Sequence, residues 1–289
     1  MNSNEWPLVF FTLLSQLSMG IILAGLIVFL LMKNQNISSN IELKRLVTFI
    51  AMSGMAVALV LSFLHLAKPL HSVYALGNIG SSFLSREILL ASLFLFALAV
   101  AWTSVRFGLP SGGSFNFLYL AALITGPLLI WVMARLYMIP TVPAWNTPLT
   151  LLKFFNSGLL LGAGAMLMAV VFLHGKGIEI PRVQQMVTIL FYLMALGVFI
   201  HLSTALIPVA AHEGMHSSFP APLIPFAWKA ARLLFLLLGF SLLAWWYPGF
   251  VSMTSRGAPY WAYLAFILLF LSEICGRYIF YASYYRVGV

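Results

Sequence analysis

The sequence predicts an all-α integral membrane protein, a single domain over residues 1–289 built as a bundle of eight transmembrane helices. Two observations on composition lead to this prediction: 62% of the residues are hydrophobic, and only 7% are charged. Soluble globular chains carry roughly 45–50% apolar and about 25% charged residues, so this chain has too few charges to cover a water-facing surface. A third observation is that apolar stretches of about 20 residues, the length that crosses a bilayer, recur along the whole chain.

Each expected helix is bounded by residues typical of loops. The first four are expected at 8–32, before Lys33; at 46–67, before Lys68-Pro69; at 85–106, before Pro110-Ser111-Gly112-Gly113; and at 115–138, before Pro140. The last four are expected at 151–173, before Gly175; at 183–206, before Pro208; at 223–246, before Pro248; and at 258–282. The helix at 223–246 has the weakest pattern, because Lys229 and Arg232 lie within it.

The basic residues predict how the helices cross the membrane, because cytoplasmic loops carry an excess of lysine and arginine. Loops after the first, third, fifth and seventh helices contain seven: Lys33, Lys44, Arg45, Arg106, Lys176, Arg182 and Arg256. The other side has two, Lys68 and Arg286. Both termini are therefore expected outside, which is the periplasm if the protein lies in a bacterial cytoplasmic (inner) membrane.

Ionisable residues within membrane helices are costly, and they are candidates for function. With this orientation they fall in the outer half of the bundle: His65, Arg86, Glu87, Arg135, Lys153, His201, Lys229, Arg232, Glu273 and Arg277. Their distribution predicts a polar cavity at or just beneath the outer surface. His65 and Glu87 lie at the same expected depth, and their short side chains cannot reach the lipid headgroups. Glu273 and Arg277 are four residues apart on one helix, so they are expected to form an ion pair.

The single cysteine, Cys275, excludes an internal disulfide, a CxxC zinc site and a cysteine-ligated iron–sulfur cluster. Any redox role therefore requires a diffusible or borrowed cofactor. The segment 212–216 matches the HExxH pattern of zinc proteases, but Gly214 interrupts it and prolines flank it, so we expect an outer loop and no metal site.

These residues are also compatible with two other functions. One is a haem b held between His65 and His201, since axial histidines on facing helices can bind haem iron. The other is a small-solute transporter. Gly158, Gly162 and Gly164 in the helix at 151–173 predict close helix packing rather than the interrupted helices typical of transporters.

Several short motifs resemble one family from end to end of the chain. They are Glu5-Trp6-Pro7-Leu8, Leu64-His65-Leu66 with Pro69, Ser85-Arg86-Glu87-Ile88, Thr141-Val142-Pro143-Ala144-Trp145, His216-Ser217-Ser218, and Glu273, Gly276, Arg277 with Phe280-Tyr281. Their order and spacing resemble those of the membrane anchor subunit of bacterial dimethyl sulfoxide reductase. The loop after the sixth helix departs from the family pattern, since it is rich in proline and contains the additional His212-Glu213.

This resemblance implies the anchor and menaquinol-oxidising subunit of an S- or N-oxide reductase complex that acts in anaerobic respiration. It implies two partners on the periplasmic face, an iron–sulfur subunit with [4Fe–4S] clusters and a catalytic subunit with molybdopterin. The chain itself would hold no haem and would use diffusible menaquinol. By the same resemblance His65 and Glu87 are the functional pair. We add Arg86, Arg135, Trp145, Glu273 and Arg277 as candidates for the quinol pocket or the docking surface.

Overall fold

The chain folds into long helices that run side by side. The computed structural model describes residues 6–32, 37–65, 76–108, 113–207 and 225–286, without the side chains at positions 37, 64, 65, 76, 113–115 and 256. Within these ranges the regular structure is helical and contains no strand. The long helices are α1 (Trp6–Leu31), α2 (Ile37–His65), α4 (Phe83–Arg106), α5 (Gly113–Tyr137), α6 (Pro148–Gly175), α7 (Val183–Ala205), α8 (Phe226–Val251) and α9 (Pro259–Ala282). Two short 3-10 turns, η3 (Leu76–Asn78) and η4 (Ser255–Gly257), connect some of them.

Among the described residues, these eight long helices are long and apolar enough to cross a membrane, which confirms the predicted fold class. Their bounds lie close to the predicted ones, with two differences. Helix α2 begins at Ile37 rather than near residue 46, and its polar first turns carry an ion pair between Glu42 and Arg45 at 2.8 Å. Helix α8 continues past Pro248, which was predicted to lie in a loop. A proline removes one helical N–H bond, but the following bond from Ser252 to the Pro248 carbonyl, 2.9 Å, is kept.

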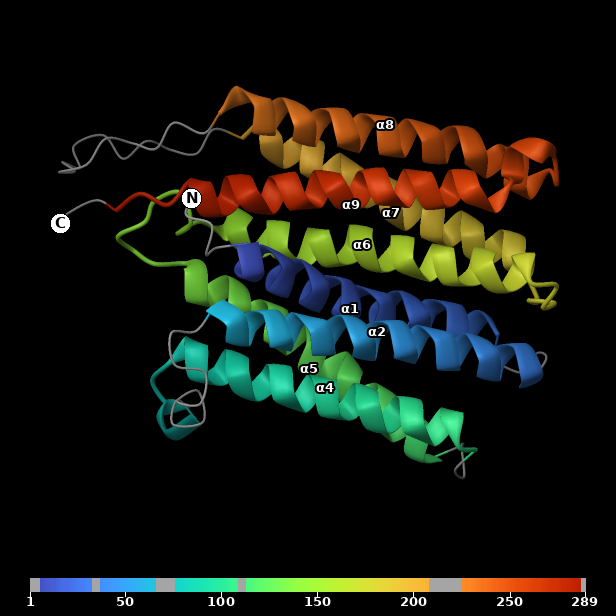
Figure 1. The fold of residues 1–289 in the computed structure, drawn as a ribbon, viewed down its shortest axis with the longest axis horizontal. Coiled ribbons are helices and arrows are strands. Elements are labelled where there is room, and N and C mark those ends of the chain that lie inside the picture. The colour runs from blue at the N-terminus through green and yellow to red at the C-terminus, as the bar shows by residue number, and fades with distance from the viewer. Residues whose placement is uncertain (1–5, 33–36, 66–75, 109–112, 208–224, 287–289) are drawn as a thin grey trace.

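The eight helices alternate in direction, and both chain termini lie at the same end of the bundle (Figure 1). Helices α1 and α6 lie at the centre, where about 70% of their membrane windows are buried (67% and 72%). Helices α4 with α5 and α8 with α9 form antiparallel pairs on opposite sides of this centre (Figure 1). The end that holds the termini is called the terminal end below.

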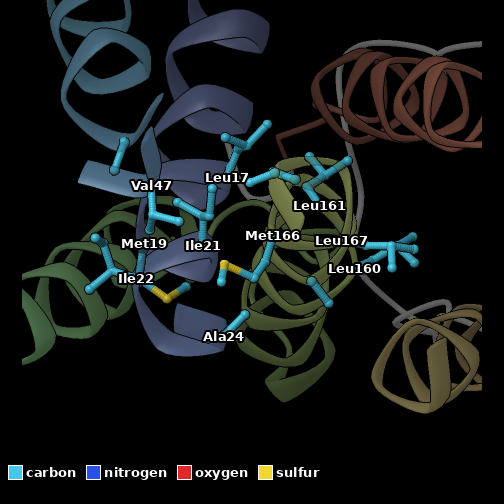
Figure 2. Packing of buried hydrophobic residues seen from close by; sticks show 14 of the residues in the cluster. Leu17, Met19, Ile21, Ile22, Ala24, Val47, Leu160, Leu161, Met166 and Leu167 are labelled. Atoms are coloured by element: carbon cyan, nitrogen blue, oxygen red, sulfur yellow. The ribbon is translucent and has the colours of Figure 1, made fainter. Parts of the chain in front are cut away.

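Glycines let the two central helices approach each other closely. A Cβ atom on Gly162 of α6 would overlap the backbone of Gly20 on α1, and one on Gly20 would overlap the carbonyl of Gly158. Close contacts of this kind through small residues are typical of membrane helix pairs. Figure 2 shows buried side chains around this contact, among them Leu17, Met19, Ile21 and Ile22 of α1 and Leu161 and Met166 of α6. The predicted role of Gly158 and Gly162 in helix packing is confirmed.

Of the basic residues used to predict the topology, those in the described part of the chain lie at or near the ends of their helices. Arg106 ends α4, Lys176 caps α6 and Arg182 precedes α7, all at the end opposite the termini. Arg135 lies in the last turn of α5, at the terminal end. The costly residues Lys153, His201, Arg232, Glu273 and Arg277 belong to the half of their helices that is nearer the terminal end.

Candidate functional site

The most buried ion-pair contact of the described residues joins α7 to α9. His201 Nε2 lies 2.6 Å from Glu273 Oε1, and both side chains are 3% exposed. Glu273 is nine residues from the end of α9 at Ala282, which corresponds to about 14 Å along the helix. A carboxylate at this depth needs hydrogen-bond donors, because an unpaired charge inside the membrane is expensive.

Two further residues complete the bonding of this pair. Arg232 of α8 places a guanidinium nitrogen 3.0 Å from His201 Nδ1. Arginine only donates hydrogen bonds, so His201 Nδ1 accepts this one. On the other side, the Ser157 hydroxyl of α6 donates to Glu273 Oε2 at 2.5 Å. Four helices, α6 to α9, thus meet at one carboxylate.

Arg277 extends the network to α1. Its guanidinium donates to Gln16 Oε1 at 2.7 Å and lies 3.5 Å from the Ser157 hydroxyl. The same guanidinium lies 4.0 Å from the centre of the Phe154 ring, a cation–π contact. The predicted direct ion pair between Glu273 and Arg277 is wrong. In the described part of the chain no such pair lies within 4.0 Å, because Ser157 from α6 stands between the two side chains.

A cavity of about 330 Å³ opens beside this network, between α6, α7, α8 and α9. Its polar lining is Lys153, Ser157, His201, Arg232, Glu273, Arg277 and Ser283. Ala144 and Ser283 belong to the loop after α5 and to the residue after α9, so the cavity reaches from the terminal end down to the buried Glu273. A polar cavity in this half of the bundle is what the distribution of charges predicts.

Glu87 lies in a separate part of the same half. It is in the second turn of α4 and is 5% exposed, and its Oε1 has no hydrogen-bond partner among the described residues. The hydroxyls of Tyr137 and Tyr281 lie near it and are hydrogen bonded to each other at 3.0 Å. Glu87 does not line the 330 Å³ cavity. A buried carboxyl with one free oxygen and two hydroxyls nearby can bind or exchange a proton.

His65 is the last residue of α2, a helix that packs against α4. Helix α2 ends and α4 begins at the terminal end of the bundle, so the His65 backbone and Glu87 belong to the same end (Figure 1). The His65 side chain lies outside the described residues, and so does the HExxH segment at 212–216. In the part of the chain that is described, no three histidine, cysteine or acidic side chains are grouped to hold a metal.

Three other residues that were predicted as candidates for the quinol pocket or the docking surface make contacts within the fold. Arg86 donates to the carbonyls of Ile79, 2.8 Å, and Gly80, 2.6 Å, and so ties the start of α4 to the segment before it. Arg135 is exposed, with its guanidinium 5.8 Å from the centre of the Phe83 ring. Trp145 is 7% exposed, and its indole nitrogen donates to the carbonyl of Phe280 at 2.8 Å. Of the candidates whose side chains are described, Glu273 and Arg277 line the cavity, whereas Arg86, Glu87, Arg135 and Trp145 do not.

The sequence alone does not identify four members of the network around Glu273 and Arg277 as site residues. His201 and Arg232 were noted for their depth but were not assigned to the site, while Gln16 and Ser157 were not considered at all. The signal for Gln16 and Ser157 is weak, because single polar residues in apolar helices commonly bond to their own backbone. Ser157 does so, with Lys153.

The comparisons with known proteins agree on one family. A family model described as the DMSO reductase anchor subunit (DmsC) matches residues 1–283. The protein is 27% identical over 290 residues to the anaerobic dimethyl sulfoxide reductase chain YnfH of Escherichia coli, covering 99% of this sequence and 97% of that one. It is 26% identical over 295 residues to the C chain of anaerobic dimethyl sulfoxide reductase from the same organism, with the same two coverages of 99% and 97%. The corresponding C chain of Haemophilus influenzae is 29% identical over 151 residues, about half of each sequence (52% and 53%).

Proposed function

Because the chain belongs to the DMSO reductase anchor subunit family and is a membrane anchor of such a complex, we propose that it also oxidises menaquinol. In this proposal the electrons pass to an iron–sulfur subunit with [4Fe–4S] clusters, and from there to a molybdopterin subunit that reduces dimethyl sulfoxide or a related S- or N-oxide. The chain is then the quinol-oxidising subunit of an oxidoreductase, while the terminal reductase site lies in a partner.

The observation that carries this proposal is the Glu87 carboxyl. It is buried, one of its oxygens has no partner among the described residues, and it belongs to the end of the bundle at which α2 ends in His65. Maintaining a buried polar atom without a partner costs about 1–3 kcal/mol. A substrate hydroxyl that supplies the missing hydrogen bond removes this cost, which gives the position a reason to bind a quinol.

In the proposed chemistry, the two protons and the two electrons of the quinol go to different acceptors. A quinol loses both when it becomes a quinone, so the chain must accept two protons while the electrons leave. His65 accepts the first proton, since an unperturbed histidine titrates near about pH 6.5. Glu87 accepts the second or orients His65. Tyr137 and Tyr281, whose hydroxyls are hydrogen bonded to each other, lie in the same half of the bundle. The nearest iron–sulfur cluster of the docked partner takes the electrons.

The proposed orientation places the terminal end of the bundle in the periplasm of a bacterial inner membrane. The partners then dock at the same end as the quinol site. Protons and electrons leave on one side, so this step by itself generates no membrane potential.

A paired assay tests the proposal. The complex is purified with His65→Ala or Glu87→Gln, and reduction of dimethyl sulfoxide is measured with a menaquinol analogue and with a soluble artificial donor. We expect the quinol-dependent rate to fall by about 10²-fold or more, since a positioned base contributes about 10²–10⁴-fold, while the artificial-donor rate stays unchanged. Glu42→Gln, at the opposite end of the bundle, is the matched control. Full quinol activity in His65→Ala would exclude His65 from the site.

A visible spectrum of the purified complex, recorded before and after reduction, distinguishes the proposed function from the haem b alternative. The proposal expects iron–sulfur absorption alone. A sharp Soret band and α band that disappear in His65→Ala and in His201→Ala would replace it with the haem b interpretation.

A further inference from the structure

A second cavity, of about 450 Å³, adjoins the first on the side of α7 and α8. It shares Lys153, His201 and Arg232 with the first cavity and adds Lys229. The remainder of its lining is almost entirely apolar: Leu202, Ala205, Ile207, Leu233, Leu236 and Ile279, with Thr204. One side of this cavity is therefore cationic and the other side is hydrocarbon.

The two cavities together hold more positive than negative charge. Their lining contains four basic side chains, Lys153, Lys229, Arg232 and Arg277, and one carboxylate, Glu273. Glu273 already accepts from Ser157 and contacts His201. Among the described residues, neither lysine has a carboxylate within 4.0 Å. Basic side chains in a poorly solvated site favour a bound anion, because an anion offsets the free-energy cost of removing their charges from water.

Hydrogen-bond donors are also in excess. Arg277 lines the first cavity and is 4% exposed, yet its buried Nε has no hydrogen-bond partner among the described residues. Arginine and lysine cannot accept hydrogen bonds, so the cavity wall offers several donors and few acceptors. A ligand that fits must bring acceptor oxygens as well as negative charge.

The apolar side of the second cavity indicates that its ligand enters from the lipid bilayer. Leu233 of α8 is 49% exposed, its neighbour on the same face Leu237 is 45% exposed, and Ile207 after α7 is 48% exposed. On a membrane helix these side chains face the lipid tails, so the cavity is bordered by bilayer. Lys229 and Arg232 are three and six residues from the start of α8, about 5 and 9 Å along the helix. In a helix that spans a bilayer, side chains this close to the helix start are expected near the boundary between headgroups and hydrocarbon.

We propose that this cavity binds one anionic phospholipid. Lys153, Lys229 and Arg232 hold its phosphodiester, and one acyl chain lies along Leu233 and Leu236. A net negative lipid is required rather than a zwitterionic one: among the described residues no carboxylate lines this cavity, and Glu273 of the adjoining cavity is already bonded and cannot take a lipid ammonium. The site also explains why basic residues gather in the half of the bundle that is opposite to the loops rich in lysine and arginine.

The test uses the complex purified with the full chain, stripped of lipid by detergent. Phosphatidylglycerol, phosphatidylcholine and inorganic phosphate are titrated separately, and the thermal unfolding midpoint of the complex is followed together with the lipid retained, by mass spectrometry. The variants are Lys153→Gln with Lys229→Gln, and, as the matched control, Lys176→Gln at the opposite end. We expect wild type and Lys176→Gln to retain phosphatidylglycerol and be stabilised by it, but not by phosphatidylcholine. The double variant should bind phosphatidylglycerol about 25-fold more weakly, from about a factor of five for each lysine removed.

Three outcomes would overturn the proposal. Equal stabilisation by phosphatidylglycerol and phosphatidylcholine would show that charge does not select the lipid. Equal stabilisation by inorganic phosphate would show a free-anion site with no place for a lipid tail. Unchanged lipid retention in the double variant, with loss of the co-purifying subunits, would show that the lysines hold an acidic segment of a partner. If the double variant unfolds during purification, Leu233→Asn, which makes the tail side polar without adding a charge, must still lower lipid retention for the proposal to stand.

Discussion

His201 Nε2 and Glu273 Oε1 lie 2.6 Å apart across the bundle, on helices α7 and α9. Helices α6 and α8 each pack against both α7 and α9, whereas α7 and α9 do not pack along their length. The pair therefore ties together two helices that hydrophobic packing leaves apart. Ser157 and Arg232 fix it from the two intervening helices, so one carboxylate organises the C-terminal half of the bundle.

Removing this carboxylate is expected to destabilise the fold. Glu273→Ala removes the carboxylate that His201 contacts and to which Ser157 donates, and breaking a buried pair in this way costs about 3–5 kcal/mol. Glu273→Gln keeps an acceptor oxygen and is expected to cost less. Thermal unfolding of the detergent-solubilised complex measures both. The control is Glu42→Ala, which removes an exposed pair worth about 0–1 kcal/mol. Equal unfolding midpoints for Glu273→Ala and Glu42→Ala would contradict the structural role of the pair.

Helix α6 is expected to tolerate a side chain at one glycine and not at another. Gly162→Leu forces α1 and α6 apart, because even a Cβ atom there overlaps the backbone of Gly20. Overpacking a well-packed core costs about 1–3 kcal/mol even where side chains can yield, and here the neighbour is backbone. Gly175→Ala, on the same helix, meets only Pro259 Cγ at 3.8 Å and should be neutral. Membrane yield and unfolding midpoint distinguish the two variants; a stable Gly162→Leu would mean that the helices can separate.

Trp145 is expected to act on stability rather than on the quinol reaction. Trp145→Phe keeps a ring that can stack on Phe280 but loses the hydrogen bond to the Phe280 carbonyl, a loss of about 0.5–1.5 kcal/mol. The ratio of quinol-dependent to artificial-donor activity should remain that of the wild type. A selective fall in the quinol-dependent rate would instead make Trp145 part of the quinol pocket.

Reporter fusions should find the terminal end of the bundle in the periplasm. Alkaline phosphatase, which is active only after export, is fused after Arg286 or after Lys176. We expect high activity from the first fusion and little from the second, since the loops at the second end carry the excess of basic residues. The reverse result would invert the orientation and place the candidate site and the proposed lipid site on the cytoplasmic side.

The number and approximate bounds of the helices could be predicted from sequence alone. A membrane helix must satisfy its backbone internally and must be apolar over about 20 residues, so local hydropathy is sufficient to find it. The same reasoning placed the costly side chains in one half of the bundle. Hydropathy failed only at the edges, where the polar turn that begins α2 and Pro248 in α8 resemble loop residues.

The partners of those side chains were decided by the tertiary structure. Every helix is apolar on most of its surface, so the sequence does not mark which face meets which neighbour. Arg277 was therefore expected to pair with Glu273 on its own helix, whereas it bonds Gln16 of α1, and Ser157 of α6 stands between them. By itself the sequence determined that the chain is a membrane protein, where its helices lie along the chain, and which half of the bundle holds the buried charged residues. Only helix packing decided that Glu273 meets His201, because that contact depends on how helices far apart in the chain turn toward one another.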